Sequence, residues 1–489
     1  MTDHHELDDP RAAGDPASAL AGAIAGAGDT IVALSTPPGR GAIAVVRLSG
    51  ARAREIAARV LEPWPPEPRV ATLSVARHPD DGSVVDRPVV TLHEAPRSYT
   101  GEHVVEIATH GGLAAPAAML EALVAAGARP AAPGEFTRRA VLNGKMDLLQ
   151  AEAVADLIDA RGDAARRAAL AQLDGGLSRR VQALRDRILD LEALIAYDID
   201  FPEEDDGPVP RERIARALAD AVAAVDALLA TAPAGALVRE GAVVVIAGAP
   251  NAGKSSLFNA LLGQRRAIVT DVPGTTRDAI EAPVEHAGWP MRLVDTAGLR
   301  EGAEAIERMG IEVSERYLAE AHLVLACADR DEELPALLHG LGALTDAPLI
   351  PVRTKADVDP PAHATTETAT VGSVDGATPD DARTPVRVSA IDRSGLTELL
   401  DRATTRLAEC YGAPPADFPL VTRARHVHAL ELARSELAAF AEAWEDAGLP
   451  APVAAVHLRA AAGALDELIG AVDVEDVLER VFSTFCVGK

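Results

Sequence analysis

The chain has 489 residues, a formal net charge of −27 and three cysteines. Its length allows two to four domains of about 100 to 200 residues each, and its negative charge excludes general binding to nucleic acid, which positive potential attracts. The cysteines lie far apart without C-x-x-C spacing, which disfavours a disulfide framework and a zinc site and favours a reducing, cytoplasmic compartment.

The first part of the chain predicts a tail followed by a compact domain. Residues 1–29 lack both a basic start and an apolar core, which is typical of a disordered tail rather than a signal peptide. Residues 30–143 alternate short β-like runs with helix-like runs, broken by turns rich in Pro and Gly. We therefore expect an α+β domain there. No apolar run approaches the length of a membrane span, so we expect no membrane partner.

Two distant segments predict one helical domain. Residues 144–236 and 408–489 are rich in Ala and Leu, with apolar residues spaced three and four apart. We interpret them as the halves of an all-α domain that is interrupted by an α/β domain at residues 241–407. The Arg-rich run at residues 161–187 favours a solvated helix face over an RNA contact.

The stretch GAPNAGKSS, Gly248 to Ser256, fits the phosphate-binding pattern G-x-x-x-x-G-K-[ST]. It follows the β-branched run 243–247 and precedes the helix-like run 257–262, which is the context that a P-loop requires. Its glycines let backbone N–H groups surround the phosphates, Lys254 neutralises them, and the Ser255 hydroxyl can hold Mg²⁺.

Three later motifs follow in the order that a GTPase requires. Gly274 to Asp278 offers Thr276 as a second hydroxyl for Mg²⁺ from a switch loop, and Asp295 to Gly298 ends a strand with a carboxylate for the Mg²⁺ shell. The third motif is Thr354 to Asp357, and Ser389 and Ala390 complete the set. The residues expected at GTP are Asn251, Ala252, Gly253, Lys254, Ser255, Ser256, Thr270, Asp271, Val272, Pro273, Gly274, Thr275, Thr276, Asp295, Thr296, Ala297, Gly298, Thr354, Lys355, Asp357, Ser389 and Ala390.

Asp357 predicts the choice of base, because its carboxylate can accept both the ring N–H and the exocyclic amine of guanine. Thr354 stands where such sites normally carry Asn. Threonine keeps a hydroxyl and loses the amide, so we expect weaker guanine affinity with specificity retained. Residues 357–385, rich in Asp, Thr, Ala and Pro, predict a surface loop inserted in this domain.

Lysine is rare in this chain, which uses Arg almost everywhere else. There are four lysines, at positions 145, 254, 355 and 489. Lys254 and Lys355 belong to the nucleotide motifs. Because a compact ammonium fits where a guanidinium does not, Lys145 and Lys489 become functional candidates, with chance as the alternative.

Five further segments lie outside the GTPase motifs: Thr36–Gly41, Thr100–Glu102 with Glu106, His110–Gly112, Pro133–Ala140 and the ending Phe485–Lys489. Together with a GTPase domain nested in a helical one, they resemble the MnmE (TrmE) family of tRNA modification GTPases. The resemblance extends from Thr30 to the end, apart from the inserted loop. It implies a multidomain fold: an α+β N-terminal domain for folate binding and dimerisation, an all-α helical domain, and an inserted α/β P-loop GTPase domain.

The resemblance also implies the reaction and its partners. The protein would act as a homodimer with the flavoprotein MnmG (GidA), which carries FAD and uses NADH. Together they would add an aminomethyl or carboxymethylaminomethyl group to C5 of the tRNA wobble uridine. The one-carbon unit would come from methylene-tetrahydrofolate or a related reduced folate. The nitrogen donor, glycine or ammonium, and the set of tRNAs stay open.

The resemblance places Arg47, Glu106, Lys145 and Lys489 in the folate pocket. Glu106 would pair its two oxygens with the pterin N–H and amine, which matches a carboxylate to a two-donor edge. From its sequence position alone, at the end of an alternating strand, Glu106 is more typical of an exposed strand carboxylate. Cys486, three residues from the end, is either a reactive thiol or a packed small residue.

GTP hydrolysis needs a residue to orient the attacking water, and Leu299 occupies the position where many small GTPases carry glutamine. The resemblance assigns this catalytic role to Glu307, acting through a bridging water, although a solvated carboxylate at a helix start is the alternative. It also implies K⁺ in place of an arginine finger. The K⁺ ligands would be Asn251, Thr270, Val272 and Thr275.

Two rival functions remain from the sequence. A regulatory or ribosome-assembly GTPase would have the same nucleotide motifs, no folate site and no role for Lys489. A folate-dependent transferase whose GTPase domain only regulates it would bind reduced folate. Binding of a reduced folate separates the first rival from the family function.

Overall fold

The computed structural model describes residues 28–200, 209–264, 281–295, 316–358, 384–413, 419–445 and 451–470, together with residues 481, 482, 485 and 488. These fall into two compact units. The first comprises the chain up to Glu152 together with the described residues from Gly470 onward, and the second comprises Ala153–Ile469. The multidomain fold class predicted from the sequence is confirmed.

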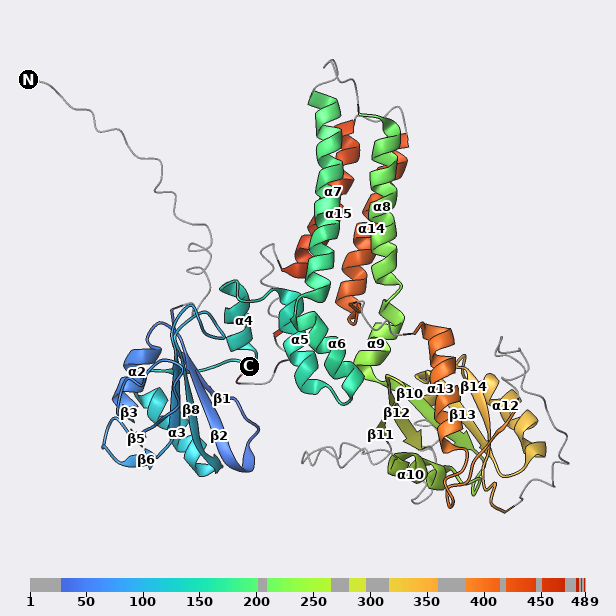
Figure 1. Cartoon of the computed structure of the whole chain (residues 1–489), viewed down its shortest axis with the longest axis horizontal. Coiled ribbons are helices and arrows are strands. Elements are labelled where there is room, and N and C mark those ends of the chain that lie inside the picture. Colours follow the sequence, from blue (N-terminus) through green and yellow to red (C-terminus); the bar gives the residue numbers. More distant parts are fainter. Residues whose placement is uncertain are drawn as a thin grey trace, which may run out of the picture. The chain divides into compact units, whose positions relative to one another are not determined.

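The first unit is built on a six-stranded sheet with two helices on one face (Figure 1). Its strands pair antiparallel, apart from the parallel pair β1–β9. In spatial order they are β4 (Thr72–Leu73), β7 (Val89–His93), β8 (Val104–Gly112), β2 (Gly39–Ser49), β1 (Ile31–Leu34) and β9 (Arg129–Pro130). A smaller sheet contains β3 (Leu61–Glu62), β5 (Val75–Arg77) and β6 (Val84–Asp86), and the helices are α2 (Ala53–Val60), α3 (Ala114–Ala125), α4 (Glu135–Leu142) and the start of α5 (Leu148–Asp159).

The alternation of side chains along β2 and β8 separates the core of this unit from its functional face. Successive strand residues point to opposite faces of a sheet. Val46 and Leu48 on β2, with Val105 and Ile107 on β8, therefore enter the buried core beneath α2 and α3. The residues between them, including the directly paired Arg47 and Glu106, lie on the other face.

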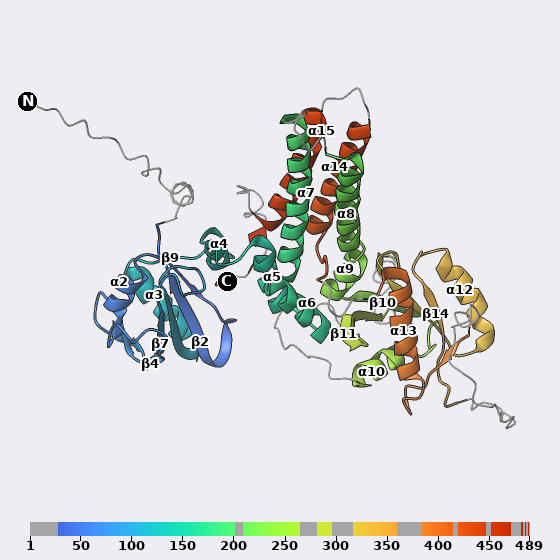
Figure 2. The ribbon, with the colours of Figure 1, turned by 45° about the horizontal axis from the view of Figure 1, so that its top comes forward.

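The helical part of the second unit contains four long helices that lie side by side: α7 (Gly176–Asp200), α8 (Arg211–Leu229), α14 (Ala424–Glu445) and α15 (Ala451–Ile469) (Figure 2). Shorter helices, α6 (Asp163–Leu173) and α9 (Ala232–Glu240), lie at the end nearest the nested domain. Apolar residues at helical spacing, such as Ile214, Ala221, Val225 and Leu228 on α8, form the buried face.

One segment of this bundle differs from the expectation that no run approaches a membrane span. Among the described residues, the stretch Arg211–Glu240 is long and apolar enough to cross a membrane, with a mean hydropathy of 1.8 in its best window. The stretch is Ala-rich and covers α8 and α9, and 44% of that window is buried inside the unit. Its hydropathy therefore fits a core helix of the bundle, which passes the same test of length and composition.

The nested domain is a second six-stranded sheet, parallel except for its edge strand β11. In spatial order the strands are β11 (Glu281–His286), β12 (Trp289–Asp295), β10 (Ala242–Gly248), β13 (Leu323–Ala328), β14 (Leu349–Arg353) and β15 (Val386–Arg387). β10 and β13 are continuous apolar runs because both faces are covered. The flanking helices are α10 (Lys254–Gln264), α12 (Leu334–Gly342) and α13 (Leu396–Tyr411), with a short 3₁₀ turn, η2 (Asp331–Glu333).

The strand order places a ligand site at the end of β10. This strand lies between β12 and β13, so the connections on its two sides run in opposite directions across the sheet. Open α/β sheets bind their ligands at such a switch point, beyond the carboxyl ends of the strands. The turn that follows β10 is the P-loop predicted from the sequence.

The two connections of the nested domain to the bundle meet at one carboxylate. Asp156 Oδ1 lies 2.9 Å from Arg239 Nε, just before β10, and 2.6 Å from Arg423 Nη2, just before α14. The Thr231 hydroxyl also accepts the Val421 backbone N–H at 3.0 Å. These contacts hold together segments that are about 190 residues apart in the chain.

Candidate functional site

The P-loop follows a path that demands glycine. Gly248 has φ +155°, and a Cβ there would lie 2.1 Å from the Cys327 carbonyl oxygen. Gly253 has φ +81° and Asn251 has φ +63°, so the loop passes through the left-handed region twice. This path brings the loop close to the end of β13, and turns of this kind can gather backbone N–H groups around an anion.

Lys254 and Ser255, the cation and the hydroxyl of the P-loop motif, begin helix α10. Lys254 is 6% exposed, and its Nζ donates to the carbonyl oxygens of Gly248 at 3.0 Å and Ala249 at 2.8 Å. Ser255 is exposed in the first turn of α10, whose N-terminal end attracts anions. Asp295 ends β12 beside Ile246 of β10 and is buried, so its carboxylate lies next to the loop.

Cys327 lies beneath this loop and is fully buried. Burial raises the pKa of its thiol to about 12, with a smaller opposing effect from Lys254. The thiol is therefore protonated at neutral pH and packs as a small apolar group. The second described free cysteine, Cys410 on α13, is exposed.

Thr354 ties the segment Thr354–Asp357, the guanine loop predicted from the sequence, to the P-loop. Its hydroxyl lies 2.6 Å from the Ala252 carbonyl oxygen and 3.1 Å from that of Ala328. Because a hydroxyl has one hydrogen, it donates to the nearer Ala252 oxygen. The hydroxyl that Thr354 offers in place of an Asn amide therefore bonds the backbone of the P-loop.

The residues expected to hold the base converge behind Thr354. The Ser389 hydroxyl donates to Asp357 Oδ1 at 2.7 Å, which joins the two loops predicted to read guanine. Lys355 adopts φ +54°, and its Nζ lies 3.0 Å from Asp329 Oδ2. The hydrogen bond from Lys355 lowers the pKa of the exposed Asp329 carboxyl.

Several predicted site residues lie outside the described residues, so the structure places none of them. They include the switch loops and Glu307, as well as two residues of the C-terminal ending. The full set is Thr270, Asp271, Val272, Pro273, Gly274, Thr275, Thr276, Thr296, Ala297, Gly298, Glu307, Cys486 and Lys489.

In the first unit, Arg47 and Glu106 form a pair on the open face of the sheet. Arg47 Nη2 lies 2.9 Å and Nε 3.1 Å from Glu106 Oε1. The other carboxylate oxygen, Oε2, lies 3.7 Å from His93 Nε2 on β7. The Arg47 side chain is 14% exposed and that of Glu106 is 35% exposed, so the carboxylate remains accessible beside a nearly buried cation.

Two aromatic rings flank the Arg47 guanidinium. Its Cζ lies 5.3 Å from the centre of the Tyr99 ring and 5.7 Å from that of the Phe136 ring, within cation–π distance. The Tyr99 hydroxyl shares a 2.8 Å hydrogen bond with the Thr137 hydroxyl. Burial raises the pKa of Tyr99, so the phenol is neutral at physiological pH.

The sequence reasoning missed His93, Tyr99 and Phe136 as site residues. Tyr99 directly precedes the segment Thr100–Glu102, and Phe136 lies inside the segment Pro133–Ala140. Both segments had been singled out for their resemblance, so the signal was present without an assignment. Lys145 contacts the same loop, because its Nζ donates to the Pro96 carbonyl oxygen at 3.1 Å.

The C-terminal end of the chain packs on the first unit. Phe482 and Phe485 are 3% and 7% exposed, and their rings contact edge to face with centroids 5.1 Å apart. Gly134, at the start of α4, would place a Cβ 3.0 Å from Phe482. The Gly488 carbonyl oxygen accepts the Ser35 hydroxyl at 3.0 Å, just after β1.

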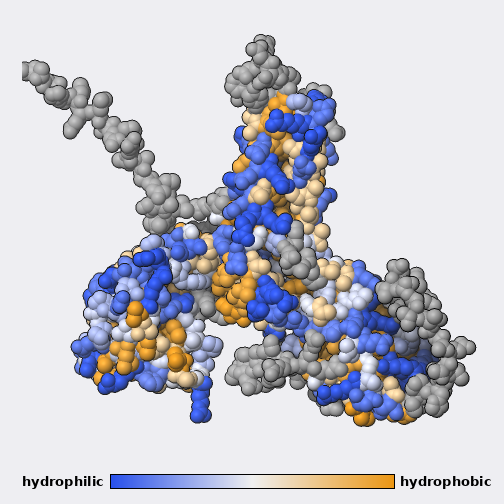
Figure 3. Space-filling model, in the orientation of Figure 1, coloured by the Kyte–Doolittle hydropathy of each residue, from blue (hydrophilic) through white to orange (hydrophobic). Residues whose placement is uncertain are grey.

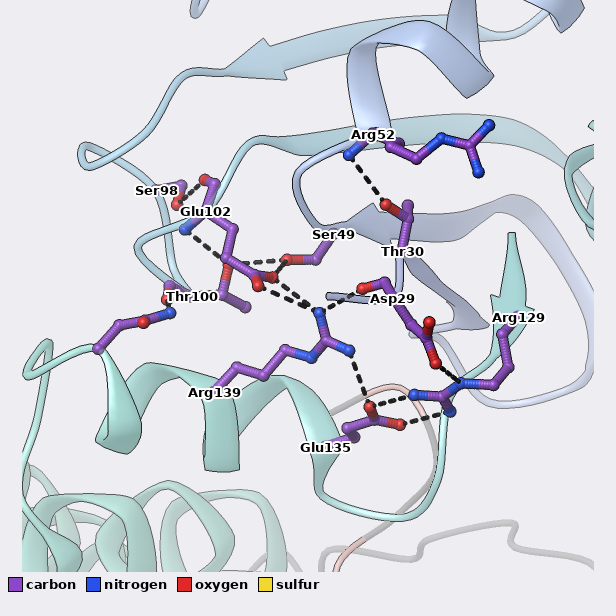
Figure 4. Close-up of polar contacts among 11 residues, drawn as sticks. Asp29, Thr30, Ser49, Arg52, Ser98, Thr100, Glu102, Arg129, Glu135 and Arg139 are labelled. Atoms are coloured by element: carbon purple, nitrogen blue, oxygen red, sulfur yellow. Dashed lines mark hydrogen bonds and ion pairs between the residues drawn. The ribbon is translucent and has the colours of Figure 1, made fainter. Parts of the chain in front are cut away.

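An ionic network around the buried Arg139 joins α4 to the neighbouring loops (Figure 4). Arg139, 8% exposed, donates from Nη1 to Glu102 at 3.1 Å and to the Asp29 carbonyl oxygen at 2.8 Å, and from Nη2 to Glu135 at 3.0 Å. Arg129 donates to both oxygens of Glu135. Burial alone would raise the pKa of Glu135, but Arg129 and Arg139 outweigh it and hold that pKa below its usual value.

A P-loop at the switch point of a parallel sheet, tied by Thr354 to a guanine loop with Asp357, defines the second unit's nested domain as that of a P-loop GTPase. Comparisons with known proteins narrow this class. Residues 148–486 match the family model described as the MnmE helical domain, and residues 30–145 match that of the GTP-binding protein TrmE N-terminus.

Whole-length relatives agree with these matches. The chain is 45% identical over 464 residues to the tRNA modification GTPase MnmE of Thermus thermophilus, covering 94% of this chain and 99% of the relative. It is 43% identical to the same protein of Moorella thermoacetica and 39% identical to that of Aquifex aeolicus, at 94% coverage of this chain in each case. The chain belongs to the MnmE family of tRNA modification GTPases, as the sequence predicted.

Proposed function

We propose that this protein hydrolyses GTP in order to modify the wobble uridine of certain tRNAs, together with the flavoprotein MnmG (GidA). The product would be an aminomethyl or carboxymethylaminomethyl group on C5, built with a one-carbon unit from methylene-tetrahydrofolate or a related reduced folate. FAD and NADH would serve on the partner. Family membership and the two sites described above support this proposal.

The nucleotide site suits GTP with Mg²⁺. The exposed Ser255 hydroxyl and the Asp295 carboxylate lie on neighbouring elements beside the P-loop, and oxygen donors of this kind suit Mg²⁺. Lys254 supplies the positive charge at the phosphates, and Asp357 supplies the acceptor for guanine. When bound, Mg²⁺ neutralises charge on the β- and γ-phosphates.

K⁺ is the proposed substitute for an arginine finger. Asn251, which is exposed in the P-loop, would contribute its side-chain oxygen, with Thr270, Val272 and Thr275 as the other ligands. We expect GTP hydrolysis to be faster in K⁺ than in Na⁺ at equal ionic strength, because the ion would stabilise charge that develops between the β- and γ-phosphates. Equal turnover numbers in the two salts would contradict this assignment.

The Arg47–Glu106 pair is the observation that carries the folate part of the proposal. A pterin presents a ring N–H and an amine on one edge, and Glu106 offers two oxygens with about two acceptor positions each. Its Oε1 can therefore accept from Arg47 and from a ligand at once. The Tyr99 ring, which is only partly buried, adds flat apolar surface beside the Arg47 guanidinium, which suits a planar ligand. Lys145 and Lys489 remain the proposed further cations.

A homodimer through the N-terminal domains is part of the proposal, and the surface of the first unit is compatible with it. Figure 3 shows apolar side chains on the visible face of this unit. Its exposed apolar residues include Leu73 on the edge strand β4 at 68% and Val84 on β6 at 53%. Exposed apolar side chains at a sheet edge are typical of a surface that another protein covers. A cytoplasmic location is proposed from the thiols and the tRNA substrate.

The deciding experiment combines the purified protein, its flavoprotein partner, tRNA, GTP and reduced folate, and measures modified uridine by nucleoside mass spectrometry. We expect the wild type to form the product, and Glu106→Gln to lose it while GTP turnover stays within about twofold, because the amide presents a donor to the pterin. Calorimetry with tetrahydrofolate supplies the independent test. A protein that hydrolyses GTP but binds no tetrahydrofolate would instead be a regulatory GTPase.

A further inference from the structure

The loop that carries Tyr99 has little backbone support of its own. Between β7 and β8, its backbone contacts include Arg97 N–H to the Glu94 carbonyl oxygen at 2.9 Å. Most of its described anchors are side-chain hydrogen bonds, such as the Ser98 hydroxyl to the Glu102 carbonyl oxygen. A surface loop of this kind adopts one conformation only when side chains fix it.

Helix α4 and the turn after it supply those side chains. Thr137 bonds Tyr99, Arg139 bonds Glu102, and the Asn143 amide donates to the Thr100 carbonyl oxygen at 2.7 Å. The Arg139 contact is the charged one of these three and lies in the ionic network of Figure 4. Ser49, next but one to Arg47 on β2, donates to Glu102 at 2.7 Å and so joins the network to the strand.

The same helix supplies Phe136, the second aromatic ring beside Arg47. Phe136 is fully buried and lies one residue from Glu135, the other carboxylate that Arg139 bonds. Arg139 therefore links the loop that carries Tyr99, through Glu102, with the start of α4 that carries Phe136, through Glu135. Tyr99 and Phe136, which both flank the Arg47 guanidinium, come from different elements, and Arg139 bonds a carboxylate close in sequence to each of them.

We propose that Arg139 is a positioning residue of the Arg47–Glu106 site. Through Glu102 and Glu135 it sets the spacing of the Tyr99 and Phe136 rings beside Arg47. The proposal rests on the folate site proposed above and adds to it the residues that hold that site in shape. A planar guanidinium that bonds one carboxylate from Nη1 and another from Nη2 holds the two at a set separation, which a lysine ammonium does less well.

The test compares wild type, Arg139→Lys and Glu102→Gln in the full-length chain by calorimetry with tetrahydrofolate. Displacement of site groups by a fraction of an ångström costs affinity, so we expect Arg139→Lys to raise the dissociation constant about tenfold with an unchanged number of sites per chain. Glu102→Gln changes it in the same direction. A purely structural role would lower the number of competent sites and leave the dissociation constant unchanged, and that result would overturn the proposal.

Asp86→Asn is the matched control. Asp86 is a side chain of similar burial, 9% exposed, which pairs with His110 at 2.6 Å on another part of the same unit. Among the described residues, its hydrogen bonds go to His110 and Arg87, and it bonds neither Tyr99 nor Phe136. We expect its dissociation constant for tetrahydrofolate to equal that of the wild type, whatever the change in melting temperature.

A ligand-free measurement separates this proposal from the folate assignment. The chain has four tyrosines, so ¹³C labelling of tyrosine rings gives few NMR signals. We expect Arg139→Lys, but not Asp86→Asn, to shift the Tyr99 ring signal. If the wild type binds no tetrahydrofolate while Tyr99 shifts, the folate assignment fails and the positioning role stands. An unmoved Tyr99 signal would contradict the positioning role in either case.

Discussion

The nucleotide site and the Arg47–Glu106 site are built in opposite ways. The P-loop depends on backbone geometry: Gly248 passes within van der Waals contact of a neighbouring carbonyl oxygen, and Asn251 and Gly253 adopt positive φ. The Arg47–Glu106 site depends on side chains that project from regular strands. A site built from the backbone constrains consecutive residues, so it can be recognised as a motif in the sequence. A site built from side chains constrains residues that are far apart, so it has no such motif.

The largest expected effect separates the two sites completely. Deleting Val487 to Lys489 should abolish wobble-uridine modification, because it removes Lys489 and the Gly488 carbonyl oxygen that Ser35 bonds. GTP turnover should stay within about twofold of the wild type. Nucleoside mass spectrometry and phosphate release measure the two activities. Full modification by the truncated protein would show that the ending has no role; Ser35→Ala serves as the milder control.

Gly248→Ala should break the backbone-built site. The new Cβ would lie 2.1 Å from the Cys327 carbonyl oxygen, so the loop must move and its phosphate contacts are lost together. We expect about a 10³-fold weaker affinity for GTP, measured with a fluorescent GTP analogue, and unchanged tetrahydrofolate binding. Gly340→Ala on α12, where a Cβ meets nothing within 4 Å, is the control and should bind GTP normally.

Glu307→Ala tests the chemistry within the nucleotide site. If Glu307 positions the attacking water, the variant should bind GTP nearly as well as the wild type and hydrolyse it at least about 10²-fold more slowly. Single-turnover hydrolysis and equilibrium binding separate the two quantities. Weak binding with a normal maximal rate would assign Glu307 a different role.

Thr354→Val tests the tether between the loops. Valine keeps the shape of threonine and removes the hydroxyl that donates to the Ala252 carbonyl oxygen at 2.6 Å. Leaving a buried acceptor unsatisfied costs about 1–3 kcal/mol, so we expect roughly tenfold weaker GDP binding. Discrimination between GDP and xanthosine diphosphate should be retained, because Asp357 is unchanged; its loss would move part of base recognition to Thr354.

The smallest expected effect concerns pH. The pKa of Glu135 is held below its usual value in the folded state, so its ion pairs contribute stability above the unfolded pKa, and this contribution is lost as the pH falls through the folded pKa. We expect the melting temperature to fall more steeply with acidification below about pH 4.5 in the wild type than in Glu135→Gln. Parallel curves would show that Glu135 makes no net contribution.

The contrast also explains what the sequence could predict. The P-loop and the strand before it were predictable because each motif residue has a role that its neighbours constrain. Glu106 was expected only through resemblance, since its pairing with Arg47 depends on the register of β2 and β8. His93 reaches Glu106, and Tyr99 and Phe136 reach Arg47, from three other parts of the chain, so spacing along the sequence does not show that they meet.

Average hydropathy alone is a poor guide at α8. Its alanines raise the average without adding much apolar surface, so a bundle helix resembles a membrane span by length and composition. Buried positions at helical spacing, which include Ile214 and Val225, distinguish it from a helix that is apolar all round. Position on the helix therefore matters more here than the average.

The two contacts of Asp156 mark the GTPase domain as an insertion whose two ends are adjacent. Because Arg239 and Arg423 both reach one carboxylate, and the Val421 N–H bonds the Thr231 hydroxyl, the two cut ends of the bundle lie close together. A short flexible linker in place of the residues between them should let the helices close without the nested domain, since inserted domains are tolerated where both ends are adjacent. The two junctions with the nested domain therefore lie side by side, and Ala234 and Leu237 of α9 pack into the core of that domain beside them.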